Sequence, residues 1–157
     1  MATEIEHKYL VNKDIWKTII PDKQVEIQQA YLLTDPEKTI RIRTKGKTGF
    51  ITIKGKTVGA SRLEYEYEIP LAEANELINQ FCSNRIEKIR HVVIHENNTW
   101  EVDVFKGLNE GLIVAEIELT SEDQKYPIPN WVDKNVTDDP RYANSNLAIK
   151  PFKTWLS

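Results

Sequence analysis

The chain has 157 residues, of which 40% are hydrophobic and 29% charged, and its 21 Lys and Arg against 24 Asp and Glu give a net charge of −3. This length fits one domain with its own core, so we expect residues 1–157 to form a single domain. The near-balance of charge argues against a nucleic-acid-binding protein, which usually carries a strongly basic face. Four Trp, six Tyr and four Phe supply apolar surface to bury, which excludes a disordered chain.

The cysteine count and the lengths of the apolar runs indicate in which cellular compartment the protein is expected. Cys82 is the only cysteine, which excludes an intramolecular disulfide and a cysteine-based metal site. The first residues carry acids and lack the basic-then-apolar pattern of a signal peptide. No apolar stretch approaches the roughly 20 residues needed to cross a bilayer. We therefore expect a cytoplasmic protein with no membrane partner.

Most of the sequence alternates between apolar and polar residues with a period of two, which is typical of β-strands. We predict eight strands, in chain order Glu4–Val11, Val25–Leu33, Thr39–Lys45, Gly49–Lys54, Arg62–Ile69, Ile86–Ile94, Thr99–Phe105 and Leu112–Leu119. Turn residues rich in Gly and Asn separate several of them, as at 44–49, 96–98 and 106–111. Eight strands with few helices predict a mainly β fold, in which an antiparallel sheet closes, or nearly closes, on itself.

One clear helix is predicted between the fifth and sixth strands. Residues 70–81 begin with Pro70 and place apolar residues on one side of a helix, at positions 71, 74, 77, 78 and 81. Weaker helical patterns lie at Asn12–Ile20 and Ser121–Tyr126. The tail Asp138–Lys150 is predicted to form a short helix or an ordered loop.

Charged residues recur two apart along the predicted strands, and such residues share one face of a strand about 6.6 Å apart. The basic residues of this face are Lys8, Arg41, Arg43, Lys54, Lys88 and Arg90. The acidic residues of this face are Glu4, Glu6, Glu64, Glu66, Asp103, Glu116 and Glu118. An ordinary sheet with one dry face and one solvated face explains the pattern of any single strand. It explains the whole set less well, because carboxylates repeat two apart on three strands and repel one another unless cations lie between them.

The alternative is a barrel whose charged face points inward and whose apolar outer face is partly covered by helices and loops. An eight-stranded barrel has room inside for side chains and one small ligand. Paired carboxylates suit Mg²⁺ or Mn²⁺, and guanidinium groups suit phosphate oxygens. The pattern thus leaves two explanations open: a solvated face, or an interior site in which two divalent ions complete the charge needed to bind a polyphosphate.

Several segments resemble those of a known family. Glu4-Ile5-Glu6-His7-Lys8 matches the ExExK signature of the CYTH superfamily, the triphosphate tunnel metalloenzymes. Six further segments resemble the family's motifs in the family's order, at residues 40–43, 52–54, 62–66, 87–90, 101–105 and 114–118. The tail at 136–144 is similar to the segment that follows the barrel in short bacterial members.

The resemblance implies an eight-stranded antiparallel tunnel lined by charged side chains, and an enzyme that acts on triphosphates with divalent metals. Short bacterial members most resemble inorganic triphosphatases, which convert tripolyphosphate and water to pyrophosphate and phosphate. A class IV adenylate cyclase and a thiamine triphosphatase remain alternatives within the family. Outside catalysis, the alternative is a polyphosphate-binding module, which would keep the cations but lack the acids needed for metals.

The resemblance also assigns expected roles to the residues of the charged face. Substrate binding is expected of Lys8, Arg41, Arg43, Lys54 and Arg90. One metal ion is expected on Glu116 and Glu118, and a second, which activates the attacking water, on the catalytic residues Glu4 and Glu6. Glu64, Glu66 and Asp103 are expected to complete the shell of either ion. Lys88 is expected to act in catalysis on the leaving phosphate or on water, and a plain phosphate clamp is equally open.

A few residues fit two explanations. Tyr31 and Tyr142 either line the mouth of the tunnel or pack in the core. Lys45 continues the face of Arg41 and Arg43, but it lies at a turn. A homodimer also remains open, because a barrel with a polar interior leaves apolar outer faces to cover.

Overall fold

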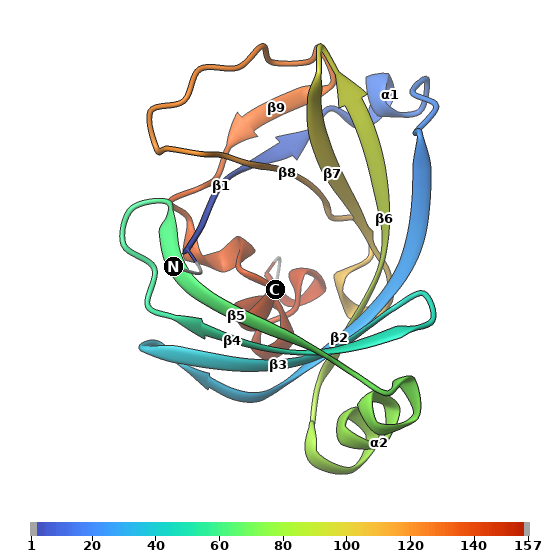
Figure 1. Cartoon of the computed structure of the whole chain (residues 1–157). Coiled ribbons are helices and arrows are strands. Elements are labelled where there is room, and N and C mark those ends of the chain that lie inside the picture. Colours follow the sequence, from blue (N-terminus) through green and yellow to red (C-terminus); the bar gives the residue numbers. More distant parts are fainter. Residues whose placement is uncertain (1–2, 156–157) are drawn as a thin grey trace.

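In the computed structural model, which describes residues 3–155, the strands form a ring that is closed by strand pairing (Figure 1). The strands are β1 (Thr3–Val11), β2 (Lys23–Asp35), β3 (Lys38–Lys45), β4 (Thr48–Gly55), β5 (Ser61–Ile69), β6 (Arg85–His95), β7 (Asn98–Phe105), β8 (Ile113–Glu118) and β9 (Val132–Asn135). The α-helices are α1 (Lys13–Trp16), α2 (Leu71–Phe81) and α3 (Asn144–Ile149). Short 3-10 helices are η1 (Gly107–Asn109), η2 (Pro140–Tyr142) and η3 (Phe152–Thr154).

Neighbouring strands pair in the order β5-β4-β3-β2-β6-β7-β8-β1, and β5 pairs again with β1 to close the ring. All of these pairings are antiparallel. The predicted closed, eight-stranded antiparallel barrel is therefore confirmed. The predicted strands are all present, and β2 extends beyond its prediction at both ends.

β1 is the strand on which closure depends. One edge of β1 pairs with β8 over Glu6–Leu10. The start of β1 pairs with β5, where Glu4 lies opposite Arg62. β9, which we did not predict, adds to the far part of β1, with Tyr9 opposite Asn135. The ExExK strand thus holds together the two ends of the barrel sheet.

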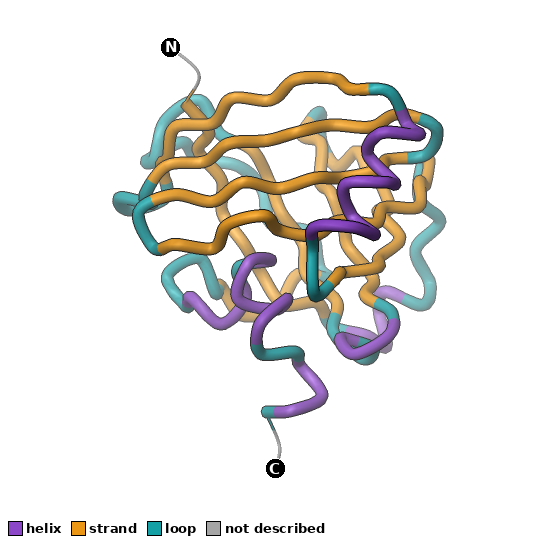
Figure 2. The backbone as a smooth tube through the Cα atoms, turned by 90° about the horizontal axis from the view of Figure 1, so that it is seen from below, coloured by secondary structure: helices purple, strands orange, loops and turns teal. Residues whose placement is uncertain are grey.

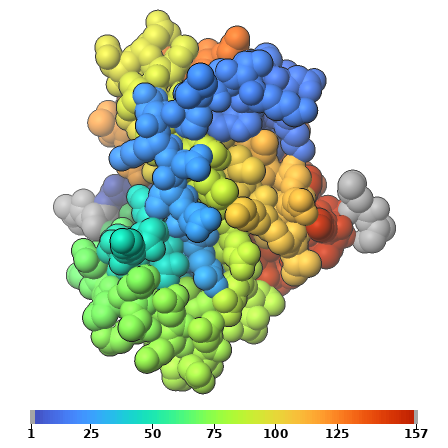
Figure 3. Space-filling view, turned by 90° about the vertical axis from the view of Figure 1, so that its right-hand side faces the viewer, coloured from blue at the N-terminus to red at the C-terminus, as the bar shows by residue number. Residues whose placement is uncertain are grey.

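Apolar clusters cover the barrel on the outside. Ala74 and Ile78 of α2 are fully buried on the outer face of β2 and β3, as predicted for the apolar side of this helix. A second outer cluster centres on Trp100 and Trp131, both almost completely buried. Figure 3 shows α1 (blue) and α2 (green) at opposite ends of one face, with β2 between them. Among residues 3–155, none of the helices combines the length and the apolar character that crossing a membrane requires.

The third cluster lies inside the barrel. Its strand residues share the inward faces of the charged positions, namely Ile86, Phe105 and Val114. Residues 136–155, here termed the C-terminal segment, pack Tyr142 and Leu147 against them. Figures 1 and 2 place this segment at one end of the ring. The interior is thus charged over part of its depth and closed at one end by an apolar floor.

Two helical predictions need correction. Ser121–Tyr126 was predicted as a helix but is an irregular loop, because Gln124 Oε1 accepts from the backbone N–H and the hydroxyl of Thr120, which turns the chain back. The helix predicted at Asn12–Ile20 is limited to α1, which is capped by the Asn12 side chain accepting from the N–H of Ile15. Pro21 disfavours helical backbone in the residue before it, so the pattern does not extend further.

Candidate active site

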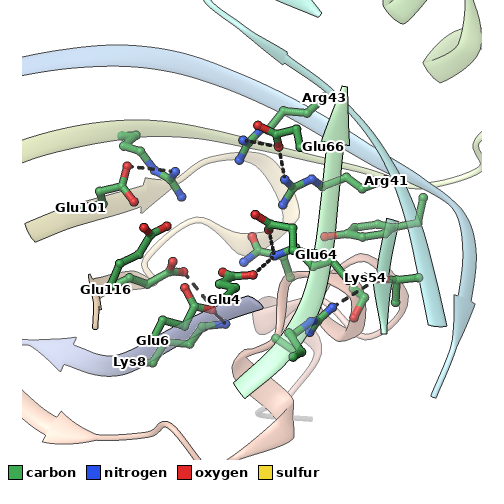
Figure 4. A pocket seen from close by; sticks show the side chains of 18 of the residues that line it. Glu4, Glu6, Lys8, Arg41, Arg43, Lys54, Glu64, Glu66, Glu101 and Glu116 are labelled. Carbon is green, nitrogen blue, oxygen red and sulfur yellow. Dashed lines mark hydrogen bonds and ion pairs between the residues drawn. The ribbon is translucent and has the colours of Figure 1, made fainter. Parts of the chain in front are cut away.

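A cavity of about 220 Å³ inside the barrel is lined mainly by charged side chains (Figure 4). The cavity is termed the tunnel below. Among the described residues, its basic side chains are Lys8, Arg41, Arg43, Lys45, Lys54, Arg62, Lys88 and Arg90. Its acidic side chains are Glu4, Glu6, Glu64, Glu66, Glu101, Glu116 and Glu118. A second cavity of about 470 Å³ shares Glu4, Lys8 and Arg62 with it and extends between the loops near residues 35, 57 and 138.

The strand order gives the tunnel two unlike walls. Acidic residues stand mainly on β1, β5, β7 and β8, and basic residues mainly on β3 and β6. Alternation along each strand sends every second residue inward. Antiparallel register then places Lys8 opposite Glu116 and Glu6 opposite Glu118. The two walls together offer a polyanion cations on one side and hard oxygen ligands on the other.

The centre of the basic wall is a guanidinium pair on β3. The Nη2 atoms of Arg41 and Arg43 both lie 3.2 Å from Glu66 Oε2, and the Thr52 hydroxyl donates to the same oxygen at 2.8 Å. Burial alone would raise the pKa of Glu66, but Thr52 and the two guanidiniums lower it. Burial and the neighbouring Arg41 and Arg90 lower the pKa of Arg43 to about 10. One carboxylate therefore pairs with two buried cations, whose Nε atoms have no acceptor among residues 3–155.

Lys54 joins two acids of the opposite wall. Its Nζ lies 3.0 Å from Glu4 Oε2 and 3.2 Å from Glu64 Oε2. Burial would raise the pKa of Glu4, but the Lys54 ammonium lowers it to about 2. Burial and the nearby Glu4 instead raise the pKa of Glu64. The buried Glu4 Oε2 faces the Lys54 ammonium in an ion pair that lacks the geometry of a hydrogen bond.

The remaining acids of β1 and β8 outnumber the cation beside them. Lys8 Nζ lies 4.0 Å from both Glu6 Oε1 and Glu116 Oε1. Burial and the Glu116 carboxylate raise the pKa of Glu6 well above its usual range. Burial and the Glu101 carboxylate raise the pKa of Glu118. Burial and like charge thus both disfavour the ionised form of these two acids.

Asp103 lies behind the basic wall and does not line the tunnel. Its side chain is 1% exposed, and its oxygens lie 2.8 Å from Lys88 Nζ and 2.8 Å from Arg90 Nε. Arg90 Nη2 also donates to Asp103 at 3.0 Å. Burial opposes ionisation, but these two cations hold the pKa of Asp103 far below its usual range. Asp103 was predicted to share in the shell of a metal ion; in this position both of its oxygens are paired with Lys88 and Arg90.

The structure brings all the other predicted site residues together in the tunnel. Lys45 also lines the tunnel. Tyr31 both lines the tunnel and packs against the apolar floor, whereas Tyr142 is a packing residue of the floor. Our prediction missed Arg62 and Glu101, although each shares a strand face with a predicted residue. It also missed Asn144, which reaches the tunnel from the C-terminal segment.

Within residues 3–155, no group of three or more acidic, histidine or cysteine side chains has the spacing of a preformed metal site. The ion pairs of Lys8 and Lys54 hold the acids in their present positions. Carboxylates placed in this way can supply part of the ligand shell of a divalent cation. Such partial coordination is usual for Mg²⁺, which keeps water and phosphate oxygens as ligands beside one or two carboxylates.

The sequence matches the model of the CYTH domain over residues 2–144. The chain belongs to the CYTH family. It is 46% identical to an inorganic triphosphatase of Acetivibrio thermocellus, with 99% of both chains covered. It is 35% identical to an inorganic triphosphatase of Nitrosomonas europaea, with 94% of this chain and 97% of the relative covered.

The fold also matches a solved member of the family. A crystal structure of an inorganic triphosphatase superposes with a TM-score of 0.66 at 34% identity, covering 95% of this chain and 96% of that chain. Similarity over nearly the full length of both proteins means that the barrel and the C-terminal segment are compared together.

Proposed function

We propose that this CYTH chain is a divalent-metal-dependent inorganic triphosphatase, which hydrolyses tripolyphosphate to pyrophosphate and phosphate. The observation that carries the proposal is the tunnel, in which a basic wall, mainly on β3 and β6, faces a wall of closely spaced carboxylates. The names of the two relatives, both inorganic triphosphatases, support the same reaction. We further propose that residues 1–157 form one domain, because strand pairing runs from Thr3 to Asn135 and the remaining segment packs inside the barrel.

In this proposal the basic wall binds the triphosphate. The guanidiniums of Arg41 and Arg43 share one carboxylate, and their Nε–H donors are unused among the described residues. A phosphate oxygen can therefore accept hydrogen bonds from these donors. Arg90 lies close enough to Arg43 to lower its pKa, which extends the positive surface along the tunnel. Lys8 and Lys54 approach the substrate from the acidic side. Asp103 supports Lys88 and Arg90 from behind.

The residues of the acidic wall fit a divalent cation. Glu4 Oε2 is a buried oxygen whose contact with Lys54 is an ion pair without hydrogen-bond geometry, and the carboxylates of Glu6 and Glu118 lie near others of like charge. We propose that Mg²⁺ or Mn²⁺, two ions in all, is held by Glu4, Glu6, Glu64, Glu66, Glu116 and Glu118 together with phosphate oxygens. When bound, the metal would neutralise phosphate charge and lower the pKa of water.

The protein's own contribution to hydrolysis is positioning, which accounts for most of the catalysis of phosphoryl transfer. Glu4 and Glu6 orient the attacking water on the acidic wall. The water oxygen bonds to a terminal phosphorus and gives up a proton to the Glu6 carboxylate, while the bridging P–O bond breaks and pyrophosphate leaves with the bond's electron pair. Lys88, facing the tunnel from the basic wall, donates a hydrogen bond to the phosphate that carries the developing charge.

The test is a comparison of hydrolysis rates for tripolyphosphate, pyrophosphate, ATP and thiamine triphosphate with Mg²⁺, with Mn²⁺ and with EDTA. We expect tripolyphosphate to be hydrolysed fastest, and EDTA to abolish turnover. Metal-independent turnover would refute the metal's role, and cyclic AMP from ATP would indicate a cyclase. A bound but uncleaved tripolyphosphate would indicate a binding module; at 100 times its dissociation constant it would stabilise the fold by about 2.7 kcal/mol.

A matched pair of variants tests the acidic wall. Glu118→Gln removes one tunnel charge and should lower kcat by about two orders of magnitude or more while the melting temperature is kept. Glu26→Gln makes the same change on an exposed residue of β2 that lies outside the tunnel, and should not alter kcat. Equal rates in the two variants would show that Glu118 takes no part in the reaction.

A further inference from the structure

The floor of the tunnel is supplied by the C-terminal segment rather than by the barrel. Ala143, Asn144 and Ser145 line the tunnel. They are held in place by Leu147, which is fully buried against inward-facing residues of the barrel. Figure 1 shows this segment (red) within the ring, and Figure 2 shows its short helices at one end of the strands. The segment therefore carries polar side chains to the inner end of a charged cavity.

Asn144 makes a specific contact at that point. Its Oδ1 accepts a hydrogen bond from Lys88 Nζ at 3.0 Å, and Lys88 Nζ also lies 2.8 Å from Asp103 Oδ2. The Lys88 side chain is 1% exposed, and its Nζ lies over the ring of Phe105 at 5.4 Å. An ammonium group has three N–H donors. Within the described part of the chain Asp103 and Asn144 take two of them, so one N–H is left for a ligand in the tunnel.

The two partners have different consequences for Lys88. Asp103 neutralises the ammonium but leaves it free to rotate about a single ion pair. A second acceptor on a separate, packed segment fixes the rotation, and so fixes the direction of the remaining N–H. Because a hydrogen bond weakens steeply as its angle departs from linearity, this direction decides how well Lys88 meets a phosphate oxygen.

We propose that Asn144 is a positioning residue for the hydrolysis of triphosphate: it orients the Lys88 ammonium so that its free N–H points at the phosphate on which charge develops. The inference rests on the proposed function. It gives the C-terminal segment a part in the reaction as well as in closing the barrel. Asn144 touches Lys88 and acts through it, so its effect must disappear when Lys88 is absent.

The test is steady-state hydrolysis of tripolyphosphate with saturating Mg²⁺. Asn144→Ala should lower kcat about 10- to 100-fold, because misplacement of a reacting group by about 1 Å can cost 100-fold. Its KM should change less than about threefold. Asn144→Asp keeps an oxygen at the acceptor position, so kcat should stay within about threefold of wild type, while the added negative charge raises KM. Lys150→Ala, a change of an exposed residue on the same segment, should alter neither constant.

A double-mutant cycle separates positioning from a structural role. In a Lys88→Met background, Asn144→Ala should change kcat by less than about twofold, because the group through which it acts is gone. An equal loss in both backgrounds, or a wild-type kcat in Asn144→Ala, would overturn the inference while leaving the proposed function intact. If Asn144→Ala does not fold, a large kcat loss in Asn144→Asp with its melting temperature kept would also overturn it. A wild-type protein that does not hydrolyse tripolyphosphate would instead refute the proposed function, and with it this inference.

Discussion

The buried cluster of Asp103, Lys88 and Arg90 permits a quantitative prediction. Asp103→Asn preserves the shape of the side chain and one acceptor, but removes the only carboxylate that Lys88 contacts within 4.0 Å among the described residues. Arg90 would retain Glu101, whose carboxylate lies 3.3 Å from its Nη1. Breaking a buried ion pair typically costs about 3–5 kcal/mol of the free energy of unfolding. Because Arg90 keeps its ion pair with Glu101, we expect a loss near the lower end, about 3 kcal/mol. For a domain of this size, such a loss lowers the melting temperature by about 10 °C.

The assay is urea and thermal unfolding of the wild type, Asp103→Asn and Asp133→Asn. Asp133 is exposed on β9, so its substitution should stay within about 0.5 kcal/mol of the wild type. Tripolyphosphate with EDTA supplies the second measurement. Because the polyanion replaces the missing charge, it should raise the melting temperature of Asp103→Asn more than that of the wild type. The reasoning is refuted if Asp103→Asn unfolds with the wild-type free energy, or if both proteins gain equally from tripolyphosphate.

Three further outcomes are expected. Burial, opposed by Asp103, lowers the pKa of Lys88 to about 8, so the affinity for tripolyphosphate should fall as the pH rises through about 8; Lys88→Arg, which stays protonated, should show a flatter profile in the same titration. Gly49→Ala would place its methyl carbon 2.7 Å from Ala74 Cβ of α2, and chemical denaturation should show a loss of about 1–3 kcal/mol with kcat unchanged. Leu147→Ala leaves a cavity under the floor and should cost about 2–5 kcal/mol, with trypsin cleavage after the exposed Lys153 faster than in the wild type.

Most of the barrel could be predicted because strand alternation is a local property of the sequence. β9 was missed because Val132–Asn135 is four residues long and has too little alternation to stand out, so its pairing with β1 is decided by tertiary contacts. The helix predicted at Ser121–Tyr126 failed for a related reason. The Gln124 side chain accepts hydrogen bonds from the backbone N–H and the hydroxyl of Thr120, and these bonds compete with helix formation. The spacing of apolar residues carries no information about them.

The part of the site that depends on which strand residues face the interior of the barrel could be predicted from the sequence. Alternation alone would also have found Arg62, which shares its face with Glu64, and Glu101, which shares its face with Asp103. Alternation does not predict how deeply an inward-facing side chain is buried, so it cannot distinguish a residue that lines the cavity from one that lies behind it. Asp103, which was predicted among the metal ligands, is a residue of the second kind. Asn144 could not be predicted, since it enters the tunnel only through the docking of a non-alternating segment.

The place of β1 has a consequence for how the enzyme acquires its activity. This strand carries Glu4, Glu6 and Lys8, yet its sheet partners β5 and β8 come much later in the chain. Pairings between residues so distant in sequence form slowly, because the intervening chain must first be ordered. During synthesis the ExExK strand, β1, stays unpaired with β8 until nearly all of the barrel strands have been made. The acidic wall can then form only in a chain that has closed, so a partly folded molecule holds no assembled site for triphosphate.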